Sequence, residues 1–303
     1  MLDLAIVIVN YNTKDLLRAC LRSVYASEGD FTYHVTVVDN ASQDGSVDMV
    51  RQEFPQAAVI PAPMNGGFAY ANNIGLRSYG YAQNQPVDTL PRYALLLNPD
   101  TEVPPTALAE MLALMDSRTE LGAAGPRLIL PDGSLDKACR RAFPSPMSFI
   151  YRGLGLSKLF PEHPRFAQYN LTYLPEDQET EVDSVVGAFM LVRREALEAV
   201  GLLDESFFMY GEDLDWAYRI KQAGWKIWYY PNVIVYHHKG AASKGNVKAR
   251  RAFYDAMAIF VRKHYKAQTH PLLYGTIMAG IALKGGLDVG LTWMRSRWME
   301  VGR

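Results

Sequence analysis

The stretch that decides the fold is Leu4-Ala-Ile-Val-Ile-Val9, six apolar residues without a polar interruption. Such a run is typical of a β-strand that is covered on both faces, as in a parallel sheet. Asn12, with the carboxylate of Asp15 three residues later, predicts the start of a helix. The side of that helix expected to be buried holds Leu17, Cys20, Leu21 and Val24. The chain therefore begins with a predicted strand and helix, the repeating unit of an α/β fold.

The same alternation of strand and helix continues to about residue 100. Apolar strands are expected at residues 35–38, 58–61 and 93–97, with helices at residues 46–54 and after Asn65. Alternating strands and helices form a mainly parallel sheet with helices on both faces, so we expect an α/β fold of this kind.

The order of elements changes in the second half of the chain. The elements expected there are a turn at 131–133, an irregular segment at 143–181, a strand at 182–192, a helix at 212–223 closed by Gly224, strands at 226–230 and 233–236, and helices from about residue 249 onward. The region beyond residue 240 is thus predicted to be a helical extension of the α/β domain.

The composition is that of an ordinary globular protein, because 49% of the 303 residues are hydrophobic and 21% are charged. The formal net charge is −1, but the charges are unevenly distributed. Residues 239–303 hold twelve Lys and Arg against three Asp and Glu, whereas the rest of the chain is acidic. A basic tail of this kind predicts an anionic partner, and lipid and nucleic acid are the usual classes.

Cysteine content and hydropathy favour a cytoplasmic protein. The two cysteines, Cys20 and Cys139, are too few for a disulfide framework or a zinc site. Residues 1–9 have no basic start and lead directly into a strand, so we expect no signal peptide. The most apolar late stretch, residues 272–283, has about half the length needed to cross a bilayer, and we therefore expect no spanning helix.

Four polar clusters follow predicted strands or begin the helices after them. They are Asn10-Tyr11-Asn12, Asp39-Asn40, Asn65-Gly66-Gly67 and Asn98-Pro99-Asp100. In an open α/β sheet, ligands bind at the carboxyl ends of the strands. Each cluster alone also fits ordinary turn chemistry, but together the clusters predict one ligand site at this edge of the sheet.

The loop after the first strand disfavours two common classes of nucleotide-binding protein. A Rossmann dinucleotide site has G-x-G-x-x-G at this point, where the chain has Asn10-Tyr11-Asn12-Thr13. A Walker A pattern is absent from the whole sequence. Dinucleotide-dependent oxidoreductases and P-loop NTPases are therefore disfavoured.

Three of the clusters carry side chains or backbone suited to a nucleotide. Asp39 can accept hydrogen bonds from a base or a ribose, and Gly66-Gly67 lets backbone N–H groups approach a phosphate or a sugar closely. A plain helix-entry loop is the alternative for the two glycines. Asp100 beside a diphosphate suits a hard divalent cation such as Mn²⁺ or Mg²⁺. The alternative for Asp100 is a cap of the helix that follows.

Six motifs in register resemble a known family. They are Ile8-Val-Asn-Tyr-Asn12, Val38-Asp-Asn-Ala-Ser42, Asn65-Gly-Gly-Phe68 with Asn72-Asn73, Leu97-Asn-Pro-Asp100, Gly187-Ala-Phe-Met190 and Tyr210-Gly-Glu-Asp-Leu-Asp-Trp216. In this order they resemble the inverting glycosyltransferases of family 2, which have the GT-A fold, and especially bacterial rhamnosyltransferase-like enzymes of surface-polysaccharide assembly. The resemblance covers residues 1–265.

The resemblance implies a donor, an acceptor and a set of site residues. The donor would be a dTDP- or UDP-sugar, with L-rhamnose as one candidate sugar, and the acceptor a glycan or a lipid-linked glycan. Asp39 would contact the base, and the whole predicted donor site is Asn10, Asn12, Asp39, Asn65, Gly66, Gly67, Asn73 and Asn98. The predicted acceptor site is Gly187, Ala188 and Trp216, although Trp216 also fits core packing.

The resemblance also implies the groups that perform the chemistry. Asn98-Pro99-Asp100 departs from the D-x-D metal motif of the family, so Asp100 is the one carboxylate expected to bind the metal there. Asp213, beside Glu212, would be the general base that takes the proton of the acceptor hydroxyl. Stabilisation of a helix N-terminus is an alternative explanation of the two acids. His237 is expected to complete the metal site, with His238 as the alternative.

Residues 1–240 are expected to form the GT-A domain, with a nucleotide-binding half at 1–103 and an acceptor-binding half at 104–240. Residues 241–303 would form a basic, amphipathic helical extension. It suits the anionic inner face of the plasma membrane, and a solvated face with a dimer-forming helix is the alternative.

Three other functions fit the sequence less well. A sugar-nucleotide pyrophosphorylase needs a Gly-rich, Arg-bearing loop after the first strand, which Asn10-Tyr11-Asn12 does not supply. A non-catalytic subunit with this fold is disfavoured because Asp100 and Asp213 are both present. Nucleic-acid binding lacks a recognition module, so we expect no nucleic-acid partner.

Overall fold

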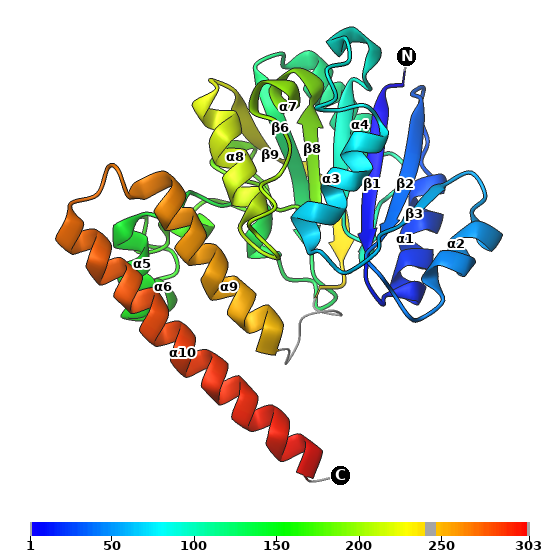
Figure 1. Ribbon diagram of the computed structural model, residues 1–303. Coiled ribbons are helices and arrows are strands. Elements are labelled where there is room, and N and C mark those ends of the chain that lie inside the picture. Colours follow the sequence, from blue (N-terminus) through cyan, green and yellow to red (C-terminus); the bar gives the residue numbers. More distant parts are fainter. Residues whose placement is uncertain (1, 240–246, 302–303) are drawn as a thin grey trace.

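The structure is a computed structural model that describes residues 2–239 and 247–301, with side chains of the last helix described as far as Met294. A nine-stranded sheet lies at its centre, with the strand order β3-β2-β1-β4-β8-β6-β9-β5, and β7 pairs with β9 (Figure 1). Helices flank this sheet, and a pair of long helices lies to one side of it. The predicted α/β fold with a helical C-terminal extension is confirmed.

The first half of the sheet is parallel, as the apolar runs predicted. It consists of β1 (Leu4–Asn10), β2 (Tyr33–Asp39), β3 (Ala58–Pro61) and β4 (Tyr93–Leu97). Every residue of β1 and β4 is buried, which explains why both strands are continuous apolar runs. The helices of this half are α1 (Lys14–Tyr25), α2 (Ser46–Glu53), α3 (Phe68–Ser78) and α4 (Ala107–Ser117).

The start of α1 differs from the prediction although its buried side agrees. Leu17, Cys20, Leu21 and Val24 are its buried residues, as expected. Asn12 is not the N-cap, because α1 begins at Lys14 and Thr13 occupies the cap position. Asn12 instead adopts a left-handed backbone conformation with φ of 54°, and its side-chain oxygen accepts a hydrogen bond from Gln43 N at 2.8 Å.

The second half of the sheet is mixed in direction. Its strands are β5 (Thr101–Glu102), β6 (Leu121–Ile129), β7 (Thr180–Val182), β8 (Phe189–Arg193) and β9 (Lys226–His237), with α7 (Arg194–Val200) and α8 (Glu212–Gln222) beside them. β8 runs antiparallel to both β4 and β6, whereas β6 and β9 are parallel. Gly224, with φ of 90°, follows the end of α8 as predicted.

Three predicted elements of this half were wrong in extent. Residues 182–192 form two strands rather than one, because the backbone of Ser184 turns aside to pair with Arg141. Residues 226–237 form one strand rather than two. Its pairing with β6 shifts in register near the point where the sequence predicted a break, and the strand continues through this irregularity. The segment 143–181 is not wholly irregular, because it contains α5 (Pro146–Gly153), which a capping box at Ser145 begins, and α6 (Leu156–Leu159).

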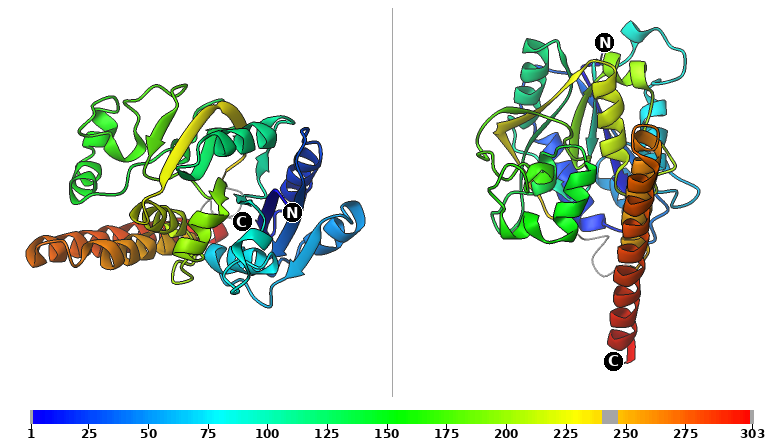
Figure 2. Two further views of the ribbon diagram at one scale, coloured as in Figure 1. Left: turned by 90° about the horizontal axis from the view of Figure 1, so that it is seen from above. Right: turned by 90° about the vertical axis from the view of Figure 1, so that its left-hand side faces the viewer.

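Several short helices lie between the longer elements. They are 3₁₀-helices at Val87–Thr89, Lys137–Cys139 and Gln168–Asn170, and a π-helical turn at Val261–Tyr265 after α9 (Val247–Phe260). The chain ends in α10 (Pro271–Val301), which packs along α9 and extends beyond the body of the molecule (Figure 2).

The length of α10 corrects the expectation that the chain has no segment able to span a bilayer. Pro271–Met294 is 24 residues long with a mean hydropathy of 1.3. By length and composition alone, a helix of this kind is long and apolar enough to cross a membrane. Residues 272–283 are only its first half, because the helix continues past Lys284 into a second apolar stretch. Only 17% of the apolar segment is buried inside the protein.

Candidate active site

A cavity of about 1650 Å³ opens at the carboxyl ends of the parallel strands. All four polar clusters reach its wall, through Tyr11, Asn40, Asn65, Gly67, Asn98 and Asp100. We call the part formed by the strand-end loops and the start of α8 the sheet wall. The part formed by α5, α9 and α10 is called the helical wall. The expectation that the clusters meet at one edge of the sheet is confirmed.

Asn10 and Asp39 lie beneath the sheet wall, where they bind each other. Asn10 donates from its side-chain nitrogen to Asp39 Oδ1 at 2.9 Å and to Ser42 Oγ at 3.0 Å. The other oxygen of Asp39 accepts a hydrogen bond from Ser42 N at 2.8 Å. Both side chains are buried, so in this structure they hold the loops after β1 and β2 together. A ligand that contacts Asp39 has to compete with these bonds.

The Asn65-Gly66-Gly67 loop is tied to β2 and to the segment before α8. Asn40 donates to Asn65 Oδ1 at 2.9 Å and accepts from Gly66 N at 3.1 Å. Gly67 has φ of 94°, and a Cβ there would collide with the carbonyl of Phe208. The close approach that makes Gly67 necessary is therefore to protein backbone.

Asn73 and Trp216 do not reach the cavity. Asn73 is buried and donates to Leu203 O at 2.9 Å and to Glu205 Oε1 at 2.8 Å, which joins α3 to the loop after α7. Trp216 is fully buried and donates to Gly201 O at 2.8 Å. The structure thus corrects the predicted donor contact of Asn73 and the predicted acceptor contact of Trp216, because both side chains serve the core.

Asp100 and His237 face each other across the sheet wall. Thr101 pairs with His237 in the ladder between β5 and β9, which brings His237 Nε2 within 3.3 Å of Asp100 Oδ1. Asn98 Nδ2 lies 3.5 Å from the same ring nitrogen. The neighbouring His238 is exposed and contacts Glu102 instead, so His237 is the histidine that reaches the cavity.

Asp136 holds the far side of the His237 ring. Its Oδ2 lies 2.9 Å from His237 Nδ1, and Lys239 contacts its other oxygen. Burial alone would lower the pKa of His237, but hydrogen bonds with Asp100 and Asp136 raise it to about 9. Although burial opposes it, the pKa of Asp136 lies below its ordinary value because His237 and Lys239 donate to the carboxylate.

The fit of a divalent metal depends on few protein ligands. Asp100 and His237 offer an oxygen and a ring nitrogen to the cavity, and Asp136 orients the imidazole as carboxylates do behind metal-binding histidines. Within residues 2–239 and 247–301, no group of three or more His, Cys, Asp or Glu could hold a metal ion. The residues fit a metal that takes its other ligands from a diphosphate and water.

The predicted catalytic pair stands at the start of α8, after Gly211 in a left-handed conformation. Asp213 Oδ2 accepts hydrogen bonds from Arg141 Nη2 at 2.7 Å and from Gly187 N at 3.1 Å. Arg141 is buried and also donates to Val185 O at 2.9 Å, which fixes its guanidinium. Asp213 and Arg141 both line the cavity, so a buried ion pair presents the carboxylate to it.

Glu212 lies beside Asp213 in a less compensated environment. Burial, and then the negative charge of Asp213, raise the pKa of Glu212 to about 8. Its Oε2 is buried without a hydrogen-bond partner among the described residues. Asp215, one step further along α8, is fully buried and contacts Arg219, Lys263 and His264, so it has a structural role.

Gly187 and Ala188 connect the two chemical centres of the cavity. Gly187 donates to Asp213, while Ala188 O accepts a hydrogen bond from Asn98 N at 2.9 Å. Both residues line the cavity between the catalytic pair and the Asn98-Pro99-Asp100 loop. Their contact with an acceptor stays a prediction.

Sequence reasoning missed Asp136 and Arg141. Both lie between the turn at Pro131–Gly133 and the segment that was expected to be irregular. Asp136 follows Leu135, which bridges to Ile129, and Arg141 bridges to Ser184, so backbone pairing brings both residues to the cavity. No spacing rule links Asp136 to His237 or Arg141 to Asp213, since the partners are 101 and 72 residues apart.

Comparison with known families agrees with this geometry. A model of the family described as "Glycosyltransferase like family 2" matches residues 3–256. The chain belongs to this family. It is therefore a glycosyltransferase enzyme with an α/β fold of the GT-A type.

Two curated relatives of this glycosyltransferase are bacterial rhamnosyltransferases. The N-acetylglucosaminyl-diphospho-decaprenol L-rhamnosyltransferase of Mycobacterium tuberculosis is 30% identical over 301 residues, which are 97% of this chain and 95% of the relative. Rhamnosyltransferase WbbL of Escherichia coli K12 is 28% identical over 239 residues, which are 77% of this chain and 82% of the relative.

Two solved structures share the fold of the glycosyltransferase. GalNAc-T7 with UDP, GalNAc and Mn²⁺ superposes with a TM-score of 0.59 at 16% identity, over 96% of this chain and 55% of that one. The mannosyltransferase PcManGT of Pyrobaculum calidifontis, in complex with GDP-Man and Mn²⁺, superposes with a TM-score of 0.56 at 16% identity, over 96% of this chain and 73% of that one.

Proposed function

We propose that this glycosyltransferase transfers a sugar, with L-rhamnose as the first candidate, from a dTDP- or UDP-sugar to a lipid-linked glycan acceptor in cell-surface polysaccharide synthesis. The observation that carries the proposal is one cavity that holds Asp213 on one side and the Asp100–His237 pair on the other. The L-rhamnosyltransferase of M. tuberculosis, which matches nearly the whole chain, supports the choice of sugar and acceptor.

Asp213 is the group proposed to act on the acceptor. Its carboxylate takes the proton of the acceptor hydroxyl while that oxygen forms a bond to the anomeric carbon. The bond from the anomeric carbon to the diphosphate oxygen breaks in the same step, and its electrons leave with the nucleoside diphosphate. A single displacement of this kind inverts the anomeric configuration. Arg141 and Gly187 N position the carboxylate for the transfer.

Asp100 and His237 are proposed to hold Mn²⁺ or Mg²⁺, with Asp136 as a positioning residue. When bound, such a metal neutralises charge on the leaving diphosphate. The imidazole has to lose a proton before it binds a metal, and its pKa of about 9 opposes that loss. Binding of the metal with a nucleotide should therefore strengthen as the pH rises toward 9. The two metal-bound fold relatives support a divalent cation here.

The enzyme is proposed to act at the cytoplasmic face of the plasma membrane. α10 exposes most of an apolar segment of 24 residues, and basic residues of α9 line the adjacent cavity. Apolar surface with flanking basic side chains binds anionic lipid. The predicted homodimer is the other use of this surface, and sedimentation of the detergent-solubilised protein distinguishes the two.

A screen of sugar nucleotides tests the proposed function. Each nucleotide is added with Mn²⁺ or with EDTA, and the shift of the unfolding temperature is recorded. A donor present at a hundred times its Kd stabilises the folded state by about 2.7 kcal/mol. The expected result is stabilisation by one dTDP- or UDP-sugar in the presence of metal. Stabilisation of the same size in EDTA contradicts the metal site, and no stabilisation by any sugar nucleotide contradicts the donor site.

A further inference from the structure

We propose that the helical wall of the cavity is the binding site for the diphosphate and hydrocarbon chain of the acceptor. This inference rests on the proposed function, since it assumes that the acceptor is a lipid-linked diphosphate sugar. It goes further by proposing that residues of α5, α9 and α10 bind the anionic group of the acceptor. The sheet wall would hold the donor and the acceptor sugar, and the helical wall the remainder of the acceptor.

The helical wall differs in charge from the rest of the cavity, because its charged lining residues are all basic among the described residues. Elsewhere the lining holds both signs, with Asp100, Asp136, Glu212 and Asp213 beside Lys137, Arg141 and Lys239. The helical wall carries Arg152 from α5, Lys248 and Arg250 from α9, and Lys284 from α10. Four cations from three helices that border one cavity favour a ligand with more than one negative charge, and a diphosphate has that charge.

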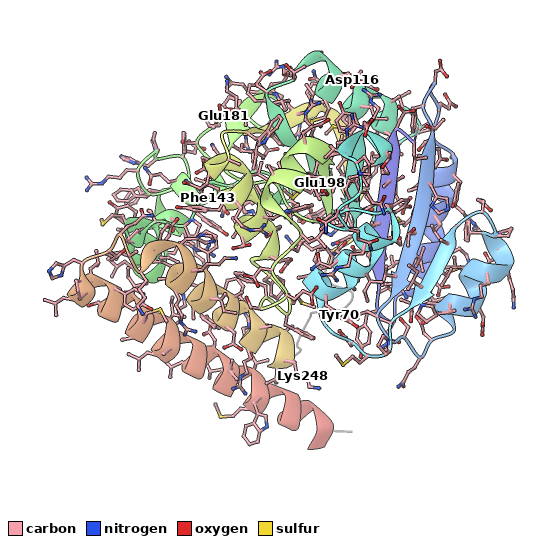
Figure 3. The ribbon with its side chains drawn as sticks, turned by 45° about the horizontal axis from the view of Figure 1, so that its top comes forward. Tyr70, Asp116, Phe143, Glu181, Glu198 and Lys248 are labelled. Carbon is pink, nitrogen blue, oxygen red and sulfur yellow. The ribbon has the colours of Figure 1, made fainter. Side chains whose placement is uncertain are left out.

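Three cations of the helical wall are accessible to a ligand. Arg152, Arg250 and Lys284 are exposed, and within the described part of the chain no ion pair joins these three to a carboxylate. The guanidinium carbon of Arg152 lies 4.9 Å from the ring centroid of Tyr169. Arg152 and Arg250 both act electrostatically on Tyr254, whose hydroxyl contacts Asp288 of α10. Figure 3 shows Lys248 at the beginning of α9, where α10 runs past it.

The helical wall also carries apolar side chains. The side chains of Phe149, Phe253, Met257, Ile277 and Ile281 line the same cavity as the basic residues. A wall that carries both cations and apolar side chains matches a ligand that has a charged group attached to a hydrocarbon chain. A free sugar phosphate would use the cations but not the apolar side chains.

The apolar surface continues outside the cavity on the same helices. Leu283 and Leu287 of α10 are 70% and 68% exposed, and Leu154, directly after α5, is 70% exposed. Exposed leucines of this kind mark a surface that contacts lipid or another protein. A hydrocarbon chain that leaves the helical wall can therefore remain in a membrane on which α10 lies.

The helical wall is continuous with the proposed general base. The ring of Phe253 on α9 contacts the ring of Tyr210 at 5.9 Å between centroids, and Tyr210 is three residues before Asp213. Ala256 of α9 packs with Phe207 and Leu214 around the start of α8. An acceptor whose sugar hydroxyl is at Asp213 can therefore extend its diphosphate toward α9 and α10.

The test compares two acceptors and two variants. The first acceptor is N-acetylglucosaminyl diphosphate linked to a fifteen-carbon isoprenoid, and the second is an alkyl N-acetylglucosaminide without phosphate. The variant Arg250→Ala/Lys284→Ala removes two cations of the helical wall. The control is Arg251→Ala, which removes a neighbouring cation of α9 that lies 3.9 Å from Asp255 outside this cavity.

The double variant is expected to raise the KM for the diphosphate acceptor at least about tenfold, the effect of losing ~1.4 kcal/mol. The KM for the alkyl glycoside and the affinity for the nucleoside diphosphate should not change, and Arg251→Ala should behave as the wild type. An equal rise for both acceptors, or no rise for either, overturns the proposal. An equal effect of Arg251→Ala also overturns the proposal, because it would mean that any cation of α9 attracts the acceptor and that Arg250 and Lys284 form no specific site.

A binding measurement separates this inference from the proposed function. The isoprenoid diphosphate itself, without a sugar, is titrated into the full chain in detergent micelles, with inorganic pyrophosphate and an isoprenoid alcohol as separate arms. Saturable binding of the isoprenoid diphosphate that weakens about tenfold in the double variant supports the helical-wall site even if no sugar is transferred. Equal binding of the alcohol overturns the role of the cations, and equal binding of pyrophosphate overturns the role of the apolar side chains.

Discussion

The two walls of the cavity are positioned by very different amounts of packing. The sheet wall stands on β1 and β4, in which every residue is buried. The helical wall is attached through two small clusters, one centred on Phe207 and Phe260 and one on Tyr254 and Ile281. The groups proposed to perform the chemistry are therefore held in place by the protein core. The helices that would receive the acceptor keep apolar surface for a partner outside the chain.

Substitution of Asp213 should give the largest effect on activity and mark the sheet wall as the place of chemistry. Asp213→Asn keeps the shape but cannot take a proton, so kcat should fall by about 10²- to 10⁴-fold. Steady-state transfer assays measure the loss, and calorimetry with the nucleoside diphosphate checks that donor binding is kept. Transfer near the wild-type rate excludes Asp213 as the base. Asp183→Asn, in a part-exposed ion pair with Lys221, is the matched control.

Removal of the cation behind Asp213 should produce the largest loss of stability. Arg141→Met leaves a buried carboxylate without its partner, which costs about 3–5 kcal/mol. Urea unfolding followed by circular dichroism measures the difference, and Arg141→Lys should recover part of it by restoring the charge. Arg250→Met in the helical wall is the comparison, with an expected change below about 0.5 kcal/mol. Similar losses at both positions contradict the contrast between the walls.

Loss of Asp100, the proposed metal ligand, should weaken the binding of the donor alone. In Asp100→Ala, the affinity for a nucleoside diphosphate in Mn²⁺ should fall about tenfold or more, while the affinity in EDTA stays the same. Titration calorimetry under the two conditions gives both values. Glu102→Ala, which removes the exposed partner of His238, is the control. Equal Mn²⁺-dependent affinity in Asp100→Ala and the wild type rules out the proposed ligand.

Polar substitution on α10 should separate membrane binding from folding. Leu283→Gln/Leu287→Gln should weaken association with anionic vesicles at least about tenfold, because an exposed leucine that enters lipid contributes ~1.5 kcal/mol or more and the loss of one such contribution already changes the association constant tenfold. The unfolding temperature should not change, since both side chains are mostly exposed. Vesicle sedimentation measures the association. Val87→Gln, on the 3₁₀-helix before β4, controls for lost surface hydrophobicity, and an equal effect there argues against a lipid-binding surface.

Glu212 should make the stability of the protein depend on pH. Its pKa is raised in the folded state from 4.5 to about 8, so the folded protein holds a proton that the unfolded chain releases. That contribution is complete below pH 4.5 and is lost as the pH rises through 8. Glu212→Gln should therefore lose less stability between pH 5 and pH 9 than the wild type, as thermal unfolding can measure. Parallel pH profiles would show that Glu212 ionises freely in the folded state.

Much of the sheet wall was predictable because it depends on local pattern. The strand at residues 93–97 agrees with the prediction residue for residue, since a buried parallel strand is an unbroken apolar run. The strand at residues 58–61 also has the predicted bounds, although none of its residues is fully buried. The later strands were less predictable. The predicted strand at 182–192 is interrupted at Ser184, which pairs with Arg141. The strand β9 continues through an irregularity in its pairing with β6, where the sequence pattern predicted that one strand ends and another begins.

The place of the strand-end clusters at one edge of an α/β sheet follows from the sequence, because strand direction and the alternation of strands and helices require it. The residues behind these clusters became known only from the packing of the folded chain. Asp136 orients His237, Arg141 pairs with Asp213, and Asn73 and Trp216 belong to the core. These contacts join residues far apart in the chain, and local periodicity carries no information on such distances. The sequence predicted a basic, apolar C-terminal tail, but only the packing of α9 and α10 showed that the tail forms a second wall of the active-site cavity.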